Sequence, residues 1–540
     1  MKSCRWFFAV LNKSKSKIVM LSFLSALSAS FLLLTTYFAN IFIKEIENNG
    51  LHSITLPLVL LIFSITFGVI LNIIYSKYLV KNTIDYRNIS LKFCYNKLLL
   101  SKLSYINSIH SGELVNTLSS DIDLAISNYF ALLPTLVSVI IKLLVGIIIL
   151  FVISYKITLI CLGLGLVIAI FMMLYRTKFK KYHKNVQKSN GKYKAFLQES
   201  LQNFEVLKIY NVNENMLFQL DKKLEKNKQD LLKKNNLSIL ASNFAYLLLS
   251  VTLYVAIIVG AIEIINKNLS FHEFVFMVML LEIVKAPFNQ ITSIFSGVFA
   301  MQASIERVKN IISNTENFEE NTSDFDRIIF ENVSFCYDKN SIFDNINFEI
   351  KSGDKLLLTG VSGAGKSTFI RLLLGLLNQS SGEIYAELND KKFSHFSDIF
   401  AFVPQNNLIF SGTILDNLKI VNENASMSDV KNACKIACID SEIENMQNGY
   451  DTILEECGKG LSQGQMQRLS IARAILSDRK FLVFDEATSG LNDELEKLVL
   501  DNIFSEVNKT ILFISHNKNI KAYANKHINI SNKKVEIINE

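Results

Sequence analysis

The sequence lacks the cysteine pattern of a disulfide-stabilised or zinc-binding protein. Its seven cysteines are odd in number and scattered along the chain, whereas a disulfide framework uses even numbers at regular spacing. Cys434 and Cys438 have the spacing to share one face of a helix, but no matching histidine or cysteine pair completes a set of metal ligands. We therefore expect reduced cytoplasmic thiols and no metal at these two residues.

Charged residues are also scarce. They make up 19% of the 540 residues, while hydrophobic residues make up 50% and the mean hydropathy is +0.28. These values exclude an ordinary soluble protein of this length. The apolar residues gather in long runs within roughly the first 300 residues, whereas the remainder alternates charged turns with short apolar stretches. The sequence therefore predicts an all-α membrane domain followed by an α/β domain.

Six apolar runs are long enough to cross a hydrocarbon core about 30 Å thick, which needs roughly 20 helical residues. Their approximate limits are residues 18–43, 54–80, 128–155, 157–175, 239–265 and 271–295. The first run is longer than the core of a cleaved signal and five more follow it, so we expect it to remain as an anchor. We predict six transmembrane helices within residues 1–313.

Lys and Arg gather in three of the segments that flank these runs, and such residues are retained on the cytoplasmic side. The cations before the first run, between the second and third, and between the fourth and fifth include Lys13, Lys15, Lys17, Lys81, Arg87, Lys92, Arg176, Lys178, Lys180, Lys181 and Lys184. We expect a multi-pass protein of the cell membrane with both termini in the cytoplasm. Because this topology explains the net charge of +7, we expect the lipid bilayer as a partner and no nucleic acid.

The two longer cytoplasmic connections contain no proline. Both have helical patterns, so we expect the spans to continue as helices far enough to contact a cytoplasmic domain, since about 25 residues extend some 38 Å. The acidic, Asn-rich and aperiodic segment 314–326 is then the natural linker. It separates the membrane domain from a second domain over residues 327–540.

A phosphate-binding loop follows a strand-like segment early in the second domain. The glycines of such a loop let backbone N–H groups surround phosphate oxygens, and the positive end of the next helix adds to this. Lys366 is expected to reach the β and γ phosphates of a nucleotide, and the Ser367 hydroxyl to bind magnesium. The loop supplies Gly360, Ser362, Gly363, Gly365, Lys366, Ser367 and Thr368.

A second motif is an apolar run that ends in two acids, Asp485 and Glu486. A buried parallel strand delivers carboxylates in this way at its C-terminal edge. Asp485 is expected to hold magnesium, and Glu486 to polarise the water that attacks the γ-phosphate. By itself such a strand is more often structural; its distance of about 120 residues from the phosphate loop favours the catalytic interpretation.

The segment 461–474, Leu-Ser-Gln-Gly-Gln-Met-Gln-Arg-Leu-Ser-Ile-Ala-Arg-Ala, resembles the signature of ABC ATPases. Ser462, Gly464 and Gln465 match the family pattern, which usually has Gly at the position of Gln463. The resemblance implies that Ser462, at a helix N-terminus, receives the γ-phosphate of ATP bound to the opposite ATPase domain. The active site would then be built from two chains, with ATP and Mg²⁺ as cofactors.

Three further residues match family positions in the expected order. Tyr337 corresponds to the aromatic residue that stacks on adenine, although a core aromatic residue is the alternative. Gln405 corresponds to the glutamine that contacts magnesium and water. His516 corresponds to the histidine that contacts the γ-phosphate, although a lone histidine would usually be structural.

The first half resembles the exporter branch of the family through segments 111–123 and 199–210, and segment 455–460 is similar to the stretch that contacts such loops. The resemblance implies a half-transporter that works as a dimer, a homodimer being favoured and a heterodimer possible. It would use ATP hydrolysis to export or flip an unidentified solute, lipid or peptide. The alternative is an ATP-gated channel or a regulatory membrane protein, which intact Glu486 and His516 disfavour.

Two departures from the family pattern qualify this interpretation. Asn492 stands where the family usually has Asp at the dimer seam, which puts the coupling between the two sites in doubt. The chain also carries no N-terminal peptidase domain, so we expect no leader-peptide cleavage.

Lys142, Glu282 and Lys285 are charged residues inside the predicted spans, where charge is costly and informative. Glu282 and Lys285 are three residues apart, so they can pair on one helix face just before a kink expected at Pro287. Lys142 lies near the middle of the third run. Either the set is self-paired and structural, or one of its members lines the pathway and meets a charged or zwitterionic solute.

Overall fold

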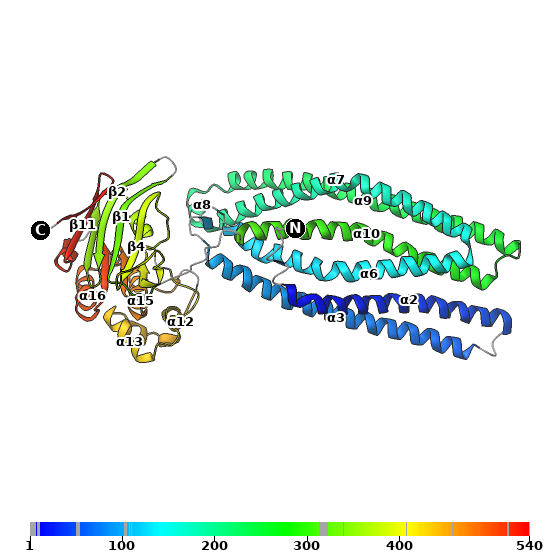
Figure 1. Ribbon diagram of the computed structural model, residues 1–540, viewed down its shortest axis with the longest axis horizontal. Helices are drawn as coiled ribbons and strands as arrows, with labels where there is room; N and C mark the ends of the chain where they lie inside the picture. The colour runs from blue at the N-terminus through cyan, green and yellow to red at the C-terminus, as the bar shows by residue number, and fades with distance from the viewer. Residues whose placement is uncertain are drawn as a thin grey trace. The chain divides into compact units, whose positions relative to one another are not determined.

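A computed structural model of the protein describes residues 7, 11–49, 54–101, 105–106, 109, 111–312, 322–337, 340–406, 408–455, 458–515 and 518–538. The chain divides into two compact units with the boundary between residues 315 and 316. Long helices build the first unit, and two sheets with surrounding helices build the second (Figure 1). The prediction of a helical domain followed by an α/β domain is confirmed.

Six long helices dominate the described part of the first unit, and each contains most or all of one apolar run. They are α2 (Lys15–Asn49), α3 (Thr55–Leu99), α6 (Ile122–Ile153), α7 (Tyr155–Gln202), α9 (Asn213–Ile265) and α10 (Phe271–Ile312). Shorter elements are η2 (Asn12–Ser14), α5 (Ser111–Asn116), the π-helical turn η4 (Thr117–Asp121) and α8 (Phe204–Tyr210). Because α3, α7 and α9 reach well beyond the apolar runs, the expected helical extensions are confirmed.

Four helices are long and apolar enough to cross a membrane within the described residues, and they contain α2, α3, α6 and α9. The other two predicted spans lie in α7 and α10, so the count of six stays a prediction. The third predicted span, at about residues 128–155, lies almost wholly in α6. Ser154 is extended, with φ −154° and ψ 106°, and it ends α6 at Ile153, where the polar sequence Ser-Tyr-Lys begins.

Close helix packing holds the first unit together. α10 packs against α6, α2 against α3 and α6, and α7 against α9 (Figure 1). A Cβ atom at Gly146 of α6 would lie only 2.6 Å from Val284 Cγ2 of α10, so glycine permits this close approach. Many large apolar side chains, among them Val19, Leu56 and Val152, are exposed. Such exposure fits a surface that faces lipid tails.

A buried ion pair joins the beginning of α6 to the end of α10. Asp121, the last residue of η4, accepts hydrogen bonds from Arg307 Nε at 2.7 Å and from Ser304 Oγ at 3.0 Å. Arg307 Nη2 donates to the same carboxylate. Since Asp121 is buried, this pair fixes the ends of the two helices against each other.

We expect Asp121→Ala to destabilise the first unit by about 1–3 kcal/mol, because Arg307 is then left partly buried without its counter-charge. The measurement is the thermal unfolding midpoint of the full-length protein in detergent. Asp123→Ala is the matched control, since the ion pair of Asp123 with Arg87 at 2.9 Å is about half exposed and is worth little. An unchanged midpoint for Asp121→Ala would contradict the structural role of the pair.

The second unit contains a six-stranded sheet in the order β12-β11-β3-β10-β9-β6 and a four-stranded sheet in the order β2-β1-β4-β5. The strands are β1 (Arg327–Tyr337), β2 (Asn340–Lys351), β3 (Lys355–Gly360), β4 (Ser381–Leu388), β5 (Lys391–Phe393), β6 (Phe400–Val403), β9 (Phe481–Asp485), β10 (Thr510–Ile514), β11 (Lys526–Ser531) and β12 (Lys534–Ile538), with a small pair β7 (Gly412–Thr413) and β8 (Ile453–Leu454). The helices are α11 (Lys366–Leu373), α12 (Ile414–Lys419), α13 (Met427–Ile436), α14 (Asp440–Glu444), α15 (Gln463–Leu476) and α16 (Asp493–Glu506), with 3₁₀ turns η5 (Ser397–Ile399), η6 (Gly449–Asp451) and η8 (Lys518–Ala522).

Alternate residues of the central strands face two separate cores, as the two-residue period of a strand requires. On one side Leu358 and Leu512 pack with Phe369 of α11 and with the aromatic residues of the four-stranded sheet. On the other side Leu357 and Phe513 pack against α12 to α16. The central strands are therefore covered on both faces, as parallel strands usually are.

The expectation that Cys434 and Cys438 share a helix face is wrong. Helix α13 ends at Ile436, and Cys438 follows its C-cap with a positive φ of 55°. Cys434 stays in the helix, where burial raises the pKa of its thiol to about 12. A thiol in this state is an inert packing group.

Candidate functional site

The parallel strands bring several of the predicted site residues to one edge of the six-stranded sheet. Leu358 of β3 is paired with Ile514 of β10, and Ile514 is paired with Asp485 of β9. In the same way β6 is paired with β9, Val403 lying opposite Phe484. Because the carboxyl ends of parallel strands meet at one edge, the phosphate loop, the acid pair and Gln405 all follow strands that end there.

The phosphate loop connects β3 to α11 in a conformation that needs glycine. Gly360 and Gly365 have φ values of 153° and 105°. A Cβ at Gly360 would lie 2.8 Å from the Ile530 carbonyl oxygen, and one at Gly365 would lie 2.9 Å from Ile342 Cγ2. The backbone N–H groups of the loop and of the first turn of α11 can therefore surround an anion.

Polar side chains of the loop lie around this opening. Lys366 Nζ donates a hydrogen bond to the Gly360 carbonyl oxygen at 2.7 Å, so its ammonium group lies over the loop. Ser362, Gly363 and Ser367 are exposed, whereas Thr368 is buried at the base of α11. The exposed Ser367 hydroxyl is thus available to a ligand or a metal ion.

The acid pair lies beside this loop. Glu486 has a positive φ of 51°, a conformation that is costly for a non-glycine residue and is often found at functional sites. Its carboxylate accepts a hydrogen bond from Gln405 Nε2 at 2.6 Å, and its backbone N–H donates to the Ile514 carbonyl oxygen at 3.1 Å. The structure therefore brings Gln405 and Glu486 together from separate strands.

Asp485 ends β9 in a more enclosed environment than Glu486. Burial raises the pKa of its carboxyl above the usual value, and the neighbouring charge of Glu486 raises this pKa further, while Lys366 and Arg371 oppose the shift. Because the charge of Lys366 lowers the pKa of Asp485, the phosphate loop and the acid pair are close enough to interact electrostatically.

Tyr337 lies at the end of β1, in a hairpin whose second strand contacts the phosphate loop. Ile342 and Phe343 of β2 flank Gly365. The Tyr337 ring packs edge-to-face on Phe335 at 4.8 Å between centroids and is 41% exposed, so it is not the core aromatic residue of the alternative interpretation. His516 lies outside the described residues, two positions after the end of β10.

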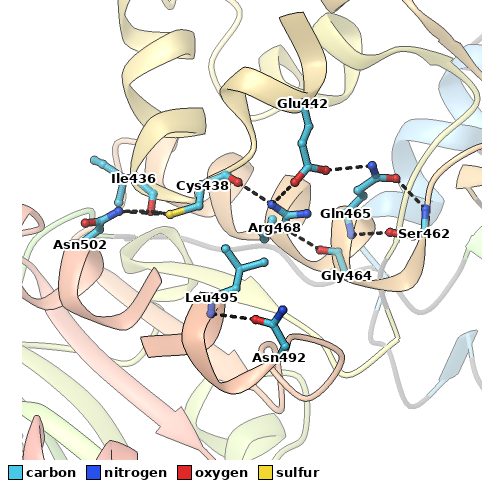
Figure 2. Close-up of polar contacts among 10 residues, drawn as sticks. All are labelled: Ile436, Cys438, Glu442, Ser462, Gly464, Gln465, Arg468, Asn492, Leu495 and Asn502. Carbon is cyan, nitrogen blue, oxygen red and sulfur yellow. Dashed lines mark hydrogen bonds and ion pairs between the residues drawn. The ribbon is translucent and has the colours of Figure 1, made fainter. Parts of the chain in front are cut away.

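The signature segment begins α15 with a reciprocal cap (Figure 2). Ser462 Oγ accepts from the Gln465 backbone N–H at 3.3 Å, and the Ser462 backbone N–H donates to Gln465 Oε1 at 2.8 Å. A Cβ at Gly464 would lie 3.2 Å from the Gly490 carbonyl oxygen. The residues that match the family pattern therefore form one compact helix start.

Glu442 of α14 supports this helix start, and sequence reasoning missed it. Its carboxylate accepts hydrogen bonds from Gln465 Nε2 at 2.9 Å and from Arg468 Nη1 at 2.6 Å (Figure 2). Burial raises the pKa of Glu442, but the hydrogen bonds from Arg468 and Gln465 lower it overall. Glu442 belongs to no motif and precedes the signature on a separate short helix, so nothing in the sequence marks it.

The segment after the acid pair is also connected to α15. Gln467 Oε1 accepts from the Gly490 N–H at 2.9 Å, and Gln467 Nε2 donates to Ser489 Oγ at 3.3 Å. Asn492 is the N-cap of α16, where its Oδ1 accepts from the Leu495 N–H at 2.9 Å (Figure 2). Since Asn and Asp cap helices about equally well, Asn492 retains the local role of the usual residue.

Comparison with known proteins agrees with this geometry. The family described as "ABC transporter transmembrane region" matches residues 18–288, and the family described as "ABC transporter" matches residues 343–489. A "Putative export ATP-binding/permease protein" of Rickettsia felis is 29% identical over 516 residues, which cover 92% of this chain and 88% of the relative.

A second relative and a solved structure match different shares of the chain. The "Lactococcin-G-processing and transport ATP-binding protein LagD" of Lactococcus lactis subsp. lactis is 32% identical over 337 residues, 60% of this chain; the match spans 47% of that relative, about half its length. The "Structure of a bacterial Atm1-family ABC exporter with ATP bound" aligns with a TM-score of 0.85 at 20% identity, covering 98% of this chain and 95% of that one. The similarity to this structure shows that the two chains share a fold.

The transmembrane region of this family fills half of the chain, and its ATP-binding domain follows with the phosphate loop, acid pair and signature in place. The chain therefore belongs to the ABC transporter family, as an exporter-type half-transporter whose ATPase domain drives transport across a membrane.

Proposed function

We propose that the chain, as a dimer of half-transporters, exports or flips an unidentified solute, lipid or peptide across the cell membrane at the expense of ATP. The hydrogen bond between Gln405 and Glu486 at the strand edge beside Lys366 supports this most strongly. Relatives named for export and transport support the direction. We assign residues 1–313 to a six-span domain, 314–326 to the linker and 327–540 to the ATP-binding domain, with the N-terminus and the ATP-binding domain cytoplasmic.

The phosphate loop would hold the nucleotide. Backbone N–H groups of Gly360, Ser362, Gly363 and Gly365, with those of the first turn of α11 that includes Thr368, bind phosphate oxygens. The Lys366 ammonium moves from the Gly360 carbonyl oxygen to the β and γ phosphates. The exposed ring of Tyr337 stacks on the adenine.

Glu486 would orient and polarise the attacking water, with Gln405 holding its carboxylate in place. His516 would contact the γ-phosphate. The Ser367 hydroxyl, the Asp485 carboxylate and the Gln405 amide oxygen form an all-oxygen donor set that fits Mg²⁺. When bound, that ion neutralises charge on the phosphates.

The proposed dimer completes each site with the signature of the other chain. Ser462 of the partner subunit, together with its Gly464 and Gln465, would receive the γ-phosphate at the start of α15. One chain carries both halves of such a site, the phosphate loop and the signature, which favours a homodimer over a heterodimer.

Glu442→Gln tests how the signature is held. Because Arg468 then lacks a counter-charge and Gln465 loses a charged acceptor, we expect a loss of about 1–2 kcal/mol in stability and slower ATP hydrolysis with an unchanged KM for ATP. Turnover and thermal unfolding of the full-length protein are the measurements. Glu444→Gln on the same helix is the control, since its ion pair with Lys431 at 2.6 Å is about half exposed. Equal turnover of Glu442→Gln and wild type would exclude this role.

Reconstitution in liposomes tests the proposed function as a whole. ATP hydrolysis and vectorial movement are read together over a panel of lipids, peptides and small solutes. A pump shows ATP-dependent accumulation of at least one of them. Binding of ATP without hydrolysis would contradict the proposal and favour an ATP-gated channel or a regulatory protein.

A further inference from the structure

A polar cavity of about 450 Å³ lies within the membrane unit, between α2, α3, α6 and α10. Lys142 of α6 is the only charged side chain among the described residues that line it. Polar groups from three helices join it: Ser138 of α6, Ser28 of α2 and Asn72 of α3. Polar groups in an apolar environment are costly unless they have hydrogen-bonding or ionic partners.

Lys142 lies deep in the predicted span. It precedes the end of α6 at Ile153 by eleven residues, a distance of about 17 Å along the helix, or about half of the hydrocarbon thickness. An ammonium group at this depth is costly, and such residues usually serve a pathway or a ligand.

Glu282 and Lys285, two other charged residues in the predicted spans, pair with each other. Lys285 Nζ lies 3.3 Å from Glu282 Oε1, and it also lies 5.3 Å from the centroid of the Tyr246 ring. The self-paired interpretation therefore holds for Glu282 and Lys285. Lys142, by contrast, has no ion pair or hydrogen bond to any residue that the structure describes.

The groups around Lys142 can donate hydrogen bonds. Ser138 is one helical turn before Lys142 on α6, so the two side chains share a face. Ser25 and Thr135, which also line the cavity, donate their hydroxyl hydrogens to the carbonyl oxygens of Pro134 and Ala131. Their oxygens then remain as acceptors. The cavity thus offers one cation, several donors and several acceptors, beside apolar walls such as Phe31 and Val69.

We propose that this cavity binds the anionic group, a phosphate or a carboxylate, of an amphiphilic transported molecule. Lys142 forms the ion pair, Ser138 and Asn72 donate hydrogen bonds, and the apolar walls contact the hydrocarbon part. The inference rests on the proposed transport function and adds the chemical class of the substrate. The anionic amphiphile can come from the bilayer as a lipid or from water as an alkyl phosphate.

The test measures ligand binding separately from ATP hydrolysis. Full-length protein in phosphatidylcholine nanodiscs is titrated with decyl phosphate in one arm and with short-chain phosphatidylglycerol in the other, without nucleotide. We expect Lys142→Gln to weaken binding at least about tenfold and Lys142→Arg to restore most of it, because the loss removes an ion pair in a low-dielectric site. The control Lys285→Gln should change binding less than about twofold.

The two arms and the control decide the outcome. Binding of either ligand that depends on Lys142 supports the inference, and the arm that binds more tightly identifies the source. Equal affinities of wild type and Lys142→Gln, or no binding in both arms, would overturn it even if ATP-driven transport of another solute is found. Lys142-dependent binding in a protein without ATP hydrolysis would uphold the site and overturn the proposed pump.

Discussion

Glu486→Gln abolishes ATP turnover while ATP binding survives. The change removes the carboxylate that is to polarise the attacking water and leaves the shape of the side chain nearly the same. A loss of about a hundredfold or more in kcat is expected for a residue that acts on the reacting water. The measurement pairs the rate of phosphate release with equilibrium binding of a fluorescent ATP analogue to the full-length protein.

The environment of Glu486 supports this expectation. Its side chain is held by Gln405 at 2.6 Å, and its backbone keeps a positive φ that costs energy. Glu494→Gln is the matched control, because Glu494 is exposed in the first turn of α16. Turnover of Glu486→Gln within a few-fold of wild type would exclude Glu486 as the catalytic base.

Lys366→Ala weakens ATP binding, with turnover lost as a consequence. The Lys366 ammonium lies 2.7 Å from the Gly360 carbonyl oxygen, within the loop that is to hold the phosphates, and no other lysine lines that loop in the sequence. Loss of a charge-assisted contact to phosphate is worth about 2–3 kcal/mol, or roughly 30- to 150-fold in Kd.

A lysine on the strand that precedes the phosphate loop provides the control for this change. Lys355 begins β3 at the opposite end from the loop, and its Nζ donates to the Phe504 carbonyl oxygen at 2.8 Å. Lys355→Ala should therefore leave the Kd for ATP near the wild-type value, even where stability falls. An unchanged Kd for Lys366→Ala in the same titration would contradict the role of the loop.

Motifs with a fixed spacing between strand, loop and helix were predictable from the sequence. The glycines of the loop before Lys366 and the apolar run that ends at Asp485 predict the local structure of each motif. Strands β3 and β9 both pair in parallel with β10, which brings the two motifs to the same edge of the sheet. The pair of Glu282 and Lys285 was likewise predictable, because three residues on a helix bring side chains to one face.

Other features depend on tertiary contacts that a single sequence does not encode locally. Glu442 contacts Gln465 and Arg468 from another helix. The cavity around Lys142 gathers residues from four helices, so the sequence could show the charge but not its surroundings.

Mixing two inactive variants tests most directly whether two copies of the chain share each ATP site. Lys366→Ala removes the phosphate-loop half, and Ser462→Arg removes the signature half. In a mixed dimer one site carries both changes, while the other combines an intact Lys366 with an intact Ser462. Since about half of randomly assembled dimers are mixed and each has one intact site of two, co-expression should restore about a quarter of the wild-type ATPase rate. A co-expressed sample as inactive as either variant alone would contradict a shared site.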